Sequence, residues 1–369
     1  MSLTQQSRYD RQVACWLLLC AAVIFGMILL GGVTRLTNSG LSMVEWKPLM
    51  GVIPPMTEGQ WQETFNKYKQ FPEYQKVNLG MDLDGFKSIF MYEYLHRVLG
   101  RLIGVIFFFP MLFFALKGRV RLGYMPRLWV LFVLGGLQGL LGWYMVKSGL
   151  VDNPRVSQYR LTSHLGLAVI IYAYMLWVAF DLLFDGRKRT APTAPNWARA
   201  IPVLVFLMIL TGGLVAGIRA GFAYNTWPLM GSSFIPPLLY DLDPWWVSAF
   251  EDITTVQFNH RMFAYALFGV MHIYAWQAIT KSHGSEGARV KVAVSLMLAA
   301  LWLQVILGIS TLLLHVPVWL AACHQGGAVL LLTTSIYTGH VLLRQVEPTT
   351  RTAGSDRLPG GLQSDDVRV

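Results

Sequence analysis

Charge is scarce in this chain of 369 residues, and cysteine is scarcer still. Only 14% of the residues are charged, whereas 54% are hydrophobic, and a soluble domain carries a much larger charged fraction. This composition excludes a soluble enzyme and favours a polytopic membrane protein. The three cysteines, Cys15, Cys20 and Cys323, all fall within apolar runs, so the outer loops have no cysteine with which to form a disulfide bond.

Acidic residues are also few, at 20 against 30 Lys and Arg, which leaves a net charge of +10. The distribution of the positive charge predicts topology and argues against a nucleic-acid partner. With the N-terminus inside, the inside segments hold 17 Lys and Arg, and the longer outside segments hold 10. This positive-inside bias predicts that both termini are cytoplasmic. The first apolar run has no evident cleavage site and no transit extension precedes it, which favours a retained anchor in a bacterial inner (plasma) membrane.

Eight apolar runs are long enough, or nearly long enough, to cross a membrane as helices. They cover 13–33, 90–116, 128–146, 161–180, 200–218, 254–279, 292–314 and 318–343. The predicted fold is therefore an all-α polytopic membrane protein with eight transmembrane helices. A long aromatic outer loop at 34–89 is expected to form a cap with short amphipathic helices.

The chain repeats its motifs in the same order. The diglycine at 31–32 recurs at 212–213, and the tryptophan motif at 46–51 recurs at 227–231 with an offset of 181. A Gln-Gly pair at 138 and 142 recurs at 304 and 308. The repeat predicts two tandem, pseudo-symmetric four-helix bundles related by an axis along the membrane normal. We assign 1–189 to the first bundle, 190–346 to the second and 347–369 to a disordered cytoplasmic tail.

Four histidines lie at corresponding places in the repeats. His96 and His164 are 68 residues apart, and His260 and His324 are 64 apart. An imidazole in an apolar helix is costly and usually functional. Two imidazoles that face each other across a helix bundle can fill both axial positions of a haem iron. The two pairs therefore predict two haem sites.

Glu93 distinguishes the two repeats. It precedes His96 by three residues and shares a helix face with it, whereas the equivalent position before His260 is Gln257. An acid can transfer a proton and an amide cannot, so one half is expected to react while the other holds a cofactor. Arg97 and Arg261 follow the two histidines and are candidates for haem propionate contacts, or alternatively for interface residues. A di-iron site is disfavoured because it needs a second Glu-x-x-His motif and more carboxylates.

These residues also carry a family resemblance. The motifs are GGVTRLTNSGLSMVEWKP at 31–48, PEYQKVN at 72–78, EYLHRVLGR at 93–101, LTSHLG at 161–166, QFNHR at 257–261 and CHQ at 323–325. Together they resemble haem A synthases of the proteobacterial and mitochondrial type over nearly the whole chain. The resemblance implies stepwise oxidation of a haem O methyl group to the formyl group of haem A, for use in haem-copper oxidases.

The resemblance also implies roles for the candidate residues. His260 and His324 would be the axial ligands of a resident haem b. His96 and His164 would receive the substrate haem O, and Glu93 would be catalytic. The expected partners are haem O synthase, haem-copper oxidase assembly factors, an electron-transfer partner of unknown identity, and membrane lipid, with no nucleic acid. Paired loop cysteines of some family members are missing here, so no role of theirs is carried over.

The alternative function is a di-haem b-type membrane electron carrier without haem-modifying activity. The four-histidine pattern fits both, and the difference between Glu93 and Gln257 favours the enzyme. The sequence leaves open the electron acceptor, the source of the inserted oxygen and the oligomeric state, including a homo-oligomer. His272, His315, His283 and His340 are expected to have structural or solvent roles.

Overall fold

The computed structural model describes residues 3–45, 53–149, 156–184, 197–282 and 284–343. Within these ranges the chain is helical and contains no strand. The eight long helices are α1 (Leu3–Leu36), α4 (Leu83–Leu116), α5 (Met125–Gly149), α6 (Gln158–Leu183), α7 (Trp197–Ile218), α9 (Ile253–Thr280), α10 (Gly284–Leu313) and α11 (Val318–Leu342). Each contains most of one predicted apolar run, so the all-helical prediction is confirmed.

Short helices occupy the segments between the long ones. They are α2 (Glu58–Tyr68), α3 (Pro72–Lys76), η1 (Ala220–Phe222), η2 (Trp245–Val247) and α8 (Ser248–Glu251). Helices α2 and α3 are the short cap helices expected in the first outer loop. The first copy of the tryptophan motif at 46–51, most of the linker at 184–199 and the predicted tail at 347–369 lie outside the described residues. The second copy at 227–231 is described.

Capping carboxylates lie at the starts of α4 and α9. Helix α4 begins after Asp82, whose side chain accepts a hydrogen bond from the Gly85 N–H at 2.8 Å. Helix α9 begins after Asp252, which accepts from the Thr255 N–H at 2.7 Å. Each carboxylate satisfies an N–H that the first helical turn leaves without a partner.

Seven of the long helices are long and apolar enough to cross a membrane. Helix α11 is not among them, although it has 25 residues. Polar side chains lower its hydropathy, among them His324, Gln325, Thr333 and Thr334. The chain is therefore a multi-pass membrane protein.

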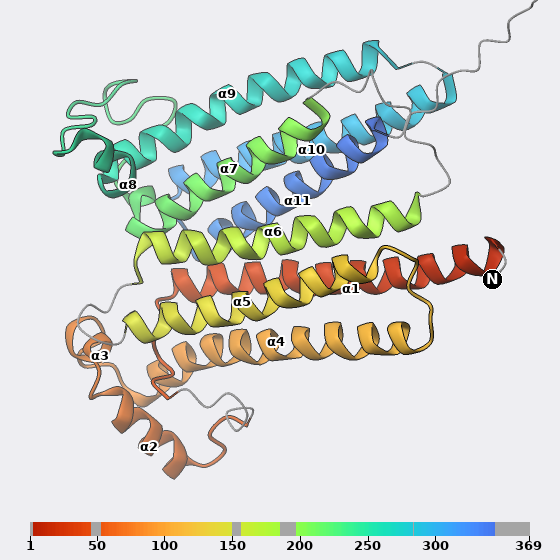
Figure 1. Cartoon of the computed structure of the whole chain (residues 1–369). Helices are drawn as coiled ribbons and strands as arrows, with labels where there is room; N and C mark the ends of the chain where they lie inside the picture. Colours follow the sequence, from red (N-terminus) through yellow and green to blue (C-terminus); the bar gives the residue numbers. More distant parts are fainter. Residues whose placement is uncertain (1–2, 46–52, 150–155, 185–196, 283, 344–369) are drawn as a thin grey trace, which may run out of the picture.

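The long helices lie side by side in a layered bundle (Figure 1). Helices α1, α6, α7 and α11 pack against one another in the centre. Helices α4 and α5 cover this centre on one side, and α9 and α10 cover it on the other. The cap helices α2 and α3 lie at the same end of the bundle as α8, and the N-terminus lies at the opposite end (Figure 1). We call the end that carries α2, α3 and α8 the capped end.

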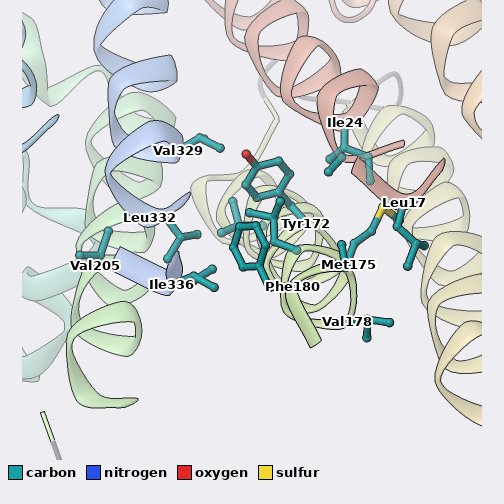
Figure 2. Close-up of a cluster of buried hydrophobic side chains, with 14 of the residues drawn as sticks. Leu17, Ile24, Tyr172, Met175, Val178, Phe180, Val205, Val329, Leu332 and Ile336 are labelled. Atoms are coloured by element: carbon teal, nitrogen blue, oxygen red, sulfur yellow. The ribbon is translucent and has the colours of Figure 1, made fainter. Parts of the chain in front are cut away.

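The hydrophobic core runs through the four central helices (Figure 2). Leu17 of α1, Val205 of α7 and Leu332 of α11 are each at most 2% exposed. Lipid is as apolar as these side chains, so close packing and hydrogen bonds between helices hold the bundle together. One such bond joins the Tyr172 hydroxyl of α6 to the Thr333 hydroxyl of α11 at 2.7 Å.

A proline within α4 is compensated by a side chain of α1. Pro110 lacks an N–H, so it cannot pair with the carbonyl of Ile106 four residues earlier. The indole N–H of Trp16 donates to that carbonyl at 2.9 Å. The bond satisfies a carbonyl that has no water to bind inside a membrane, and it joins α1 to α4.

A buried polar cluster joins three helices at the end opposite the caps. Asp181 of α6 is 3% exposed and pairs with Arg127 of α5 at 2.9 Å. Its other carboxylate oxygen lies 3.3 Å from Nε2 of His340, a 2% exposed residue of α11.

His272 of α9 packs on Phe268, with Nδ1 2.8 Å from the Phe268 carbonyl oxygen. Both histidines thus have structural contacts, as expected.

Candidate functional site

The four predicted histidines lie on four different helices, toward the capped end of each. His164, His260 and His324 fall within the first two turns or so of α6, α9 and α11. His96 lies further into α4, because α4 begins inside the cap. His96 is close enough to His164, and His260 to His324, for electrostatic interaction. The structure thus brings together the same two pairs that the spacing predicts.

Each of the four imidazole rings lies against a glycine of a neighbouring helix. A Cβ atom added to Gly31 of α1 would lie 3.1 Å from Cε1 of His96, and one on Gly142 of α5 would lie 3.0 Å from Cε1 of His164.

The second half repeats this arrangement. A Cβ atom on Gly212 of α7 would lie 3.4 Å from Cε1 of His260, and one on Gly308 of α10 would lie 2.7 Å from Cε1 of His324. The repeated glycines therefore have a physical role: they make room for the histidine rings between the helices.

Three of the rings carry a buried nitrogen that the protein does not satisfy. Within the described residues, the Nδ1 atoms of His96, His164 and His324 have no hydrogen-bond partner. The Nδ1 atom of His260 lies 2.8 Å from the Thr211 hydroxyl. A buried polar atom without a partner costs about 1–3 kcal/mol, which a ligand bound by the ring can offset.

This donor set fits a haem. Paired imidazoles supply both axial positions of a haem iron, and the surrounding helices are apolar, as a haem requires. The side-chain amide of Gln138 lies beside His164, with Nε2 3.0 Å from the His164 carbonyl oxygen and 3.4 Å from its Nε2. Gln304, its repeat equivalent, lies against Gly327 on the helix that carries His324.

Glu93 is buried and holds the segment that follows α1. It is 3% exposed. Its Oε2 accepts from the Ser42 hydroxyl at 2.8 Å and from the Met43 N–H at 2.7 Å. Its Oε1 pairs with Nη2 of Arg97 at 2.5 Å, and the same Nη2 donates to the Met43 carbonyl at 2.8 Å. The three partners of the carboxylate are donors, the arrangement expected for an anion.

Gln257 and Arg261 repeat this arrangement without an acid. Gln257 Nε2 donates to the Tyr224 carbonyl at 3.0 Å, and Arg261 Nη2 donates to the same carbonyl at 2.8 Å. Arg261 Nη1 also donates to the carbonyls of Thr226 and Leu229, at 2.9 and 3.2 Å. Both arginines thus bind the backbone that follows the first helix of their half. Their contacts with haem propionates stay a prediction.

The second glycine of each diglycine contacts the other half. Gly32 of α1 lies directly against the side chain of Gln325 on α11, next to His324. Gln325 Nε2 donates to the Ile28 carbonyl at 2.8 Å. Gly213 of α7 lies against Thr162 on α6, two residues before His164, with a Cβ position 2.9 Å from the hydroxyl oxygen. The two histidine sites therefore adjoin one contact region between the halves.

Repeat-equivalent positions meet across this region. Arg35 Nη2 donates to the Gly217 carbonyl at 2.8 Å and to the Ala216 carbonyl at 3.4 Å. Arg219 Nη2 donates to Oδ1 of Asn38. Positions 35 and 216, like 38 and 219, differ by 181, which is the offset of the repeated tryptophan motif.

Sequence reasoning missed several residues that shape the site. The glycines were recognised as repeats but not as neighbours of the histidines. Ser42 and Gln325 lie within the motifs at 31–48 and 323–325 but were given no role, and Thr211 was not singled out. The spacing from Gly31 to His96 and from Gly212 to His260, 65 and 48 residues, contains no signal for such a contact.

Comparison with known proteins identifies the family. The model of a family described as cytochrome oxidase assembly protein (COX15-CtaA) matches residues 14–336. A protein of Nitrosospira multiformis named "Heme A synthase" is 52% identical over 345 residues, covering 92% of this chain and 96% of its own length. Proteins of the same name from Paramagnetospirillum magneticum and Nitrosomonas eutropha are 50% and 49% identical, covering 91% and 88% of this chain and 95% and 92% of their own lengths. The chain therefore belongs to the cytochrome oxidase assembly protein family.

Proposed function

We infer that this chain is a haem A synthase, an oxidoreductase that converts haem O to haem A. The observation that carries this inference is the sequence identity of about 50% to proteins named heme A synthase, over about nine-tenths of the chain. The buried histidine pairs support it because they provide the donors that a haem protein needs. The haem A produced would serve haem-copper oxidases, in keeping with the family's description.

The two halves bind two different haems. His96 and His164, in the half comprising 1–189, bind the substrate haem O. His260 and His324, in the half comprising 190–346, hold a resident haem b, which supplies one-electron redox chemistry at its iron when bound. The difference between Glu93 and Gln257 supports this assignment, because an acid stands beside one histidine pair only.

Two four-helix bundles with eight spans fit this division. Helices α1, α4, α5 and α6 would form the first bundle, and α7, α9, α10 and α11 the second. The repeated glycine–histidine contacts and the contacts between equivalent positions support a pseudo-twofold axis. The cap helices α2 and α3 of the first half and helix α8 of the second half lie at one end of the bundle, which supports parallel and not inverted repeats. Helix α11 completes the second bundle as an eighth span shielded by α1, α6, α7 and α10.

Glu93 acts on protons in the first half. Conversion of a methyl group to a formyl group removes hydrogen, so protons have to leave the pocket. The carboxylate of Glu93 can accept a proton, and Ser42, Met43 and Arg97 hold it in place. Arg97 also fixes the segment after α1 over this site. The glycines beside the histidines keep the rings oriented between the helices.

The cellular setting follows from the charge distribution. The chain lies in a bacterial inner membrane with both termini in the cytoplasm, because the predicted inside segments carry most of the Lys and Arg. Its functional partners are haem O synthase, haem-copper oxidase assembly factors and an electron-transfer protein.

The test is co-expression with a haem O synthase in a host that makes no haem A, followed by extraction and chromatography of the haems. The wild-type chain should produce haem A. Glu93→Gln should insert, fold and accumulate haem O or a partly oxidised product, because an amide cannot take a proton. Gln257→Glu is the matched variant in the second half and should have a much milder effect. Absence of haem A from wild-type membranes that contain haem O and the folded protein would contradict the proposal and favour a di-haem electron carrier.

A further inference from the structure

The cap over α4 contains a second buried acid, in the motif 72–78. Helices α2 and α3 fold over the start of α4, where the rings of Phe65 and Tyr68 each stack on Phe86 with centroids 5.0 Å apart. Glu73 lies in α3 beneath this aromatic cluster and is 4% exposed. A carboxyl group is rarely buried to this extent without a function or a charge partner.

The contacts of Glu73 place it at the end of a short hydrogen-bond chain. The Asn78 side-chain amide donates to the Tyr68 hydroxyl oxygen at 2.7 Å, and the Tyr68 hydroxyl lies 3.4 Å from Oε2 of Glu73, to which it donates. The backbone N–H groups of Val77 and Asn78 bind the Glu73 carbonyl, each at 3.0 Å, and fix the turn. This network includes a hydroxyl group and a carboxyl group, both of which can pass a proton.

Met43 lies between this aromatic cluster and Glu93. Met43 packs against the cluster that contains Tyr68, and its N–H donates to the Glu93 carboxylate at 2.7 Å. The negative charge of Glu93 acts on both Glu73 and Tyr68. Burial, together with this charge, raises the pKa of Glu73 to about 8, so its carboxyl group holds a proton at neutral pH.

The second half has no such acid in its described outer segments. Asp241, Asp243 and Glu251 are exposed there, and Asp252 caps α9. Glu251 accepts a hydrogen bond from the Tyr159 hydroxyl at 2.8 Å. The half that contains the amide Gln257 thus lacks a buried carboxyl in its outer segments, whereas the half that contains Glu93 has one. The two acids occur together, which links them to the same chemistry.

We propose that Glu73 and Tyr68 carry protons between Glu93 and the outer surface of the cap, so that Glu73 is a second acid of the reaction. This inference rests on the proposed function and adds a residue to it. In the resting state the pair holds its proton on Glu73, and three hydrogen-bond donors hold the carboxyl group of Glu93.

Each transfer moves one proton outward and leaves the two acids as they were. Glu93 takes the proton that the substrate releases and becomes neutral, so its repulsion of a negative Glu73 disappears. Glu73 then breaks its O–H bond and gives that proton to water at the cap surface. The Tyr68 hydroxyl hydrogen moves to Glu73, and the proton that Glu93 releases, carried by water between the two groups, replaces it on the hydroxyl oxygen. The pair returns to its resting state, with one proton moved outward and no electron transferred in these steps.

The test compares three cap variants in the co-expression system. Glu73→Gln keeps the shape and the hydrogen bonding of a neutral carboxyl but cannot exchange a proton. Tyr68→Phe removes the hydroxyl alone. Glu63→Gln is the matched control, because Glu63 lies in the same cap, pairs with Lys67 at 2.9 Å and has a 68% exposed side chain. The measurements are the ratio of haem A to haem O between pH 6 and 9, the resident haem content and the melting temperature.

The proposal predicts that Glu73→Gln lowers haem A formation by about tenfold or more. Tyr68→Phe should lower it as well, and Glu63→Gln should leave it unchanged. The resident haem content and the melting temperature should equal those of the wild type in Glu73→Gln. The wild-type profile should change near pH 8, and Glu73→Gln should lack this change. Glu93, with its partner Arg97, and Tyr68 are the other ionisable groups that act on this carboxyl.

Two results would overturn the proposal. Wild-type haem A formation by Glu73→Gln at every pH would exclude a proton-carrying role. Loss of haem A together with a lower melting temperature and lost resident haem would make Glu73 a structural residue of the cap. Failure here is distinct from failure of the proposed function, because the wild type and Glu93→Gln are measured in the same membranes. If the wild type makes haem A and Glu93→Gln does not, either of these two results rejects the role of Glu73 alone and leaves the proposed function in place.

Discussion

The glycines beside the histidines allow a graded test of the resident haem site. Gly308 and Gly212 flank His324 and His260, the two proposed ligands of one haem. An alanine methyl at Gly308 would lie 2.7 Å from Cε1 of His324, whereas one at Gly212 would lie 3.4 Å from Cε1 of His260. Carbon atoms of non-bonded groups rarely approach within 3.0 Å, and 3.4 Å is an ordinary contact. The two substitutions are identical in chemistry and differ in the space available.

The expected magnitude follows from this difference. Gly308→Ala forces the His324 ring, or helix α10, to move by about 0.7 Å to reach an ordinary contact distance. Overpacking of this kind costs about 1–3 kcal/mol, which corresponds to about 5–150-fold in haem affinity. Gly212→Ala needs no such movement, because its methyl group would lie at an ordinary contact distance, so it should leave the haem affinity close to that of the wild type. Gly269→Ala is the control, since a methyl there meets nothing within 4 Å.

The assay measures how firmly each purified protein retains its haem. Haem is quantified per polypeptide by the pyridine haemochrome method, and its loss is followed after addition of excess apomyoglobin as a haem acceptor. Gly308→Ala should lose haem fastest, and Gly212→Ala and Gly269→Ala should resemble the wild type. Equal retention by Gly308→Ala and Gly269→Ala would refute the close contact between this glycine and the His324 ring. Equal loss by Gly212→Ala and Gly308→Ala would refute the graded spacing.

Three other predictions concern stability. Trp16→Phe leaves the Ile106 carbonyl unsatisfied and should destabilise the protein by about 1 kcal/mol, measured by thermal unfolding in detergent against a surface Trp276→Phe control. Asp181→Ala removes the acceptor beside buried His340 and should cost about 3 kcal/mol, whereas a loss below about 1 kcal/mol would contradict a structural role for this cluster. Because the folded-state pKa of Glu73, about 8, lies above its ordinary value, the folded state binds the extra proton and cap stability should fall as pH rises from about 4.5 to about 8. Hydrogen exchange of the cap amides measures this slope, which Glu73→Gln should abolish.

Much of the fold could be predicted from hydropathy, because a membrane-spanning chain has to satisfy its backbone inside each apolar run. All eight runs are helices. The start of α4 could not be predicted from hydropathy, since Asp82 caps this helix in polar sequence several residues before the apolar run that begins at 90. The start of α9 at Ile253 lies next to the predicted 254. Hydropathy also ranks α11 below the other long helices, because this helix carries polar side chains in the centre of the bundle.

The site was predicted less completely. The pairs His96–His164 and His260–His324 were predictable because the repeat conserves their order and spacing within the chain. The contacts of Glu93 with Ser42 and Met43 were not, because they join a helix to an irregular loop. The burial of Glu73 was also unpredictable, since α3 has only five residues and its environment depends on how the cap folds over α4.

The most direct test of the account compares His164→Ala with His324→Ala in the same co-expression membranes. The first histidine is assigned to the substrate and the second to the resident haem. His164→Ala should keep the six-coordinate low-spin spectrum of the resident haem and make no haem A. His324→Ala should lose that spectrum. A His164→Ala protein that still makes haem A at the wild-type level, or a His324→Ala protein with an unchanged low-spin spectrum, would contradict the division of labour between the two halves.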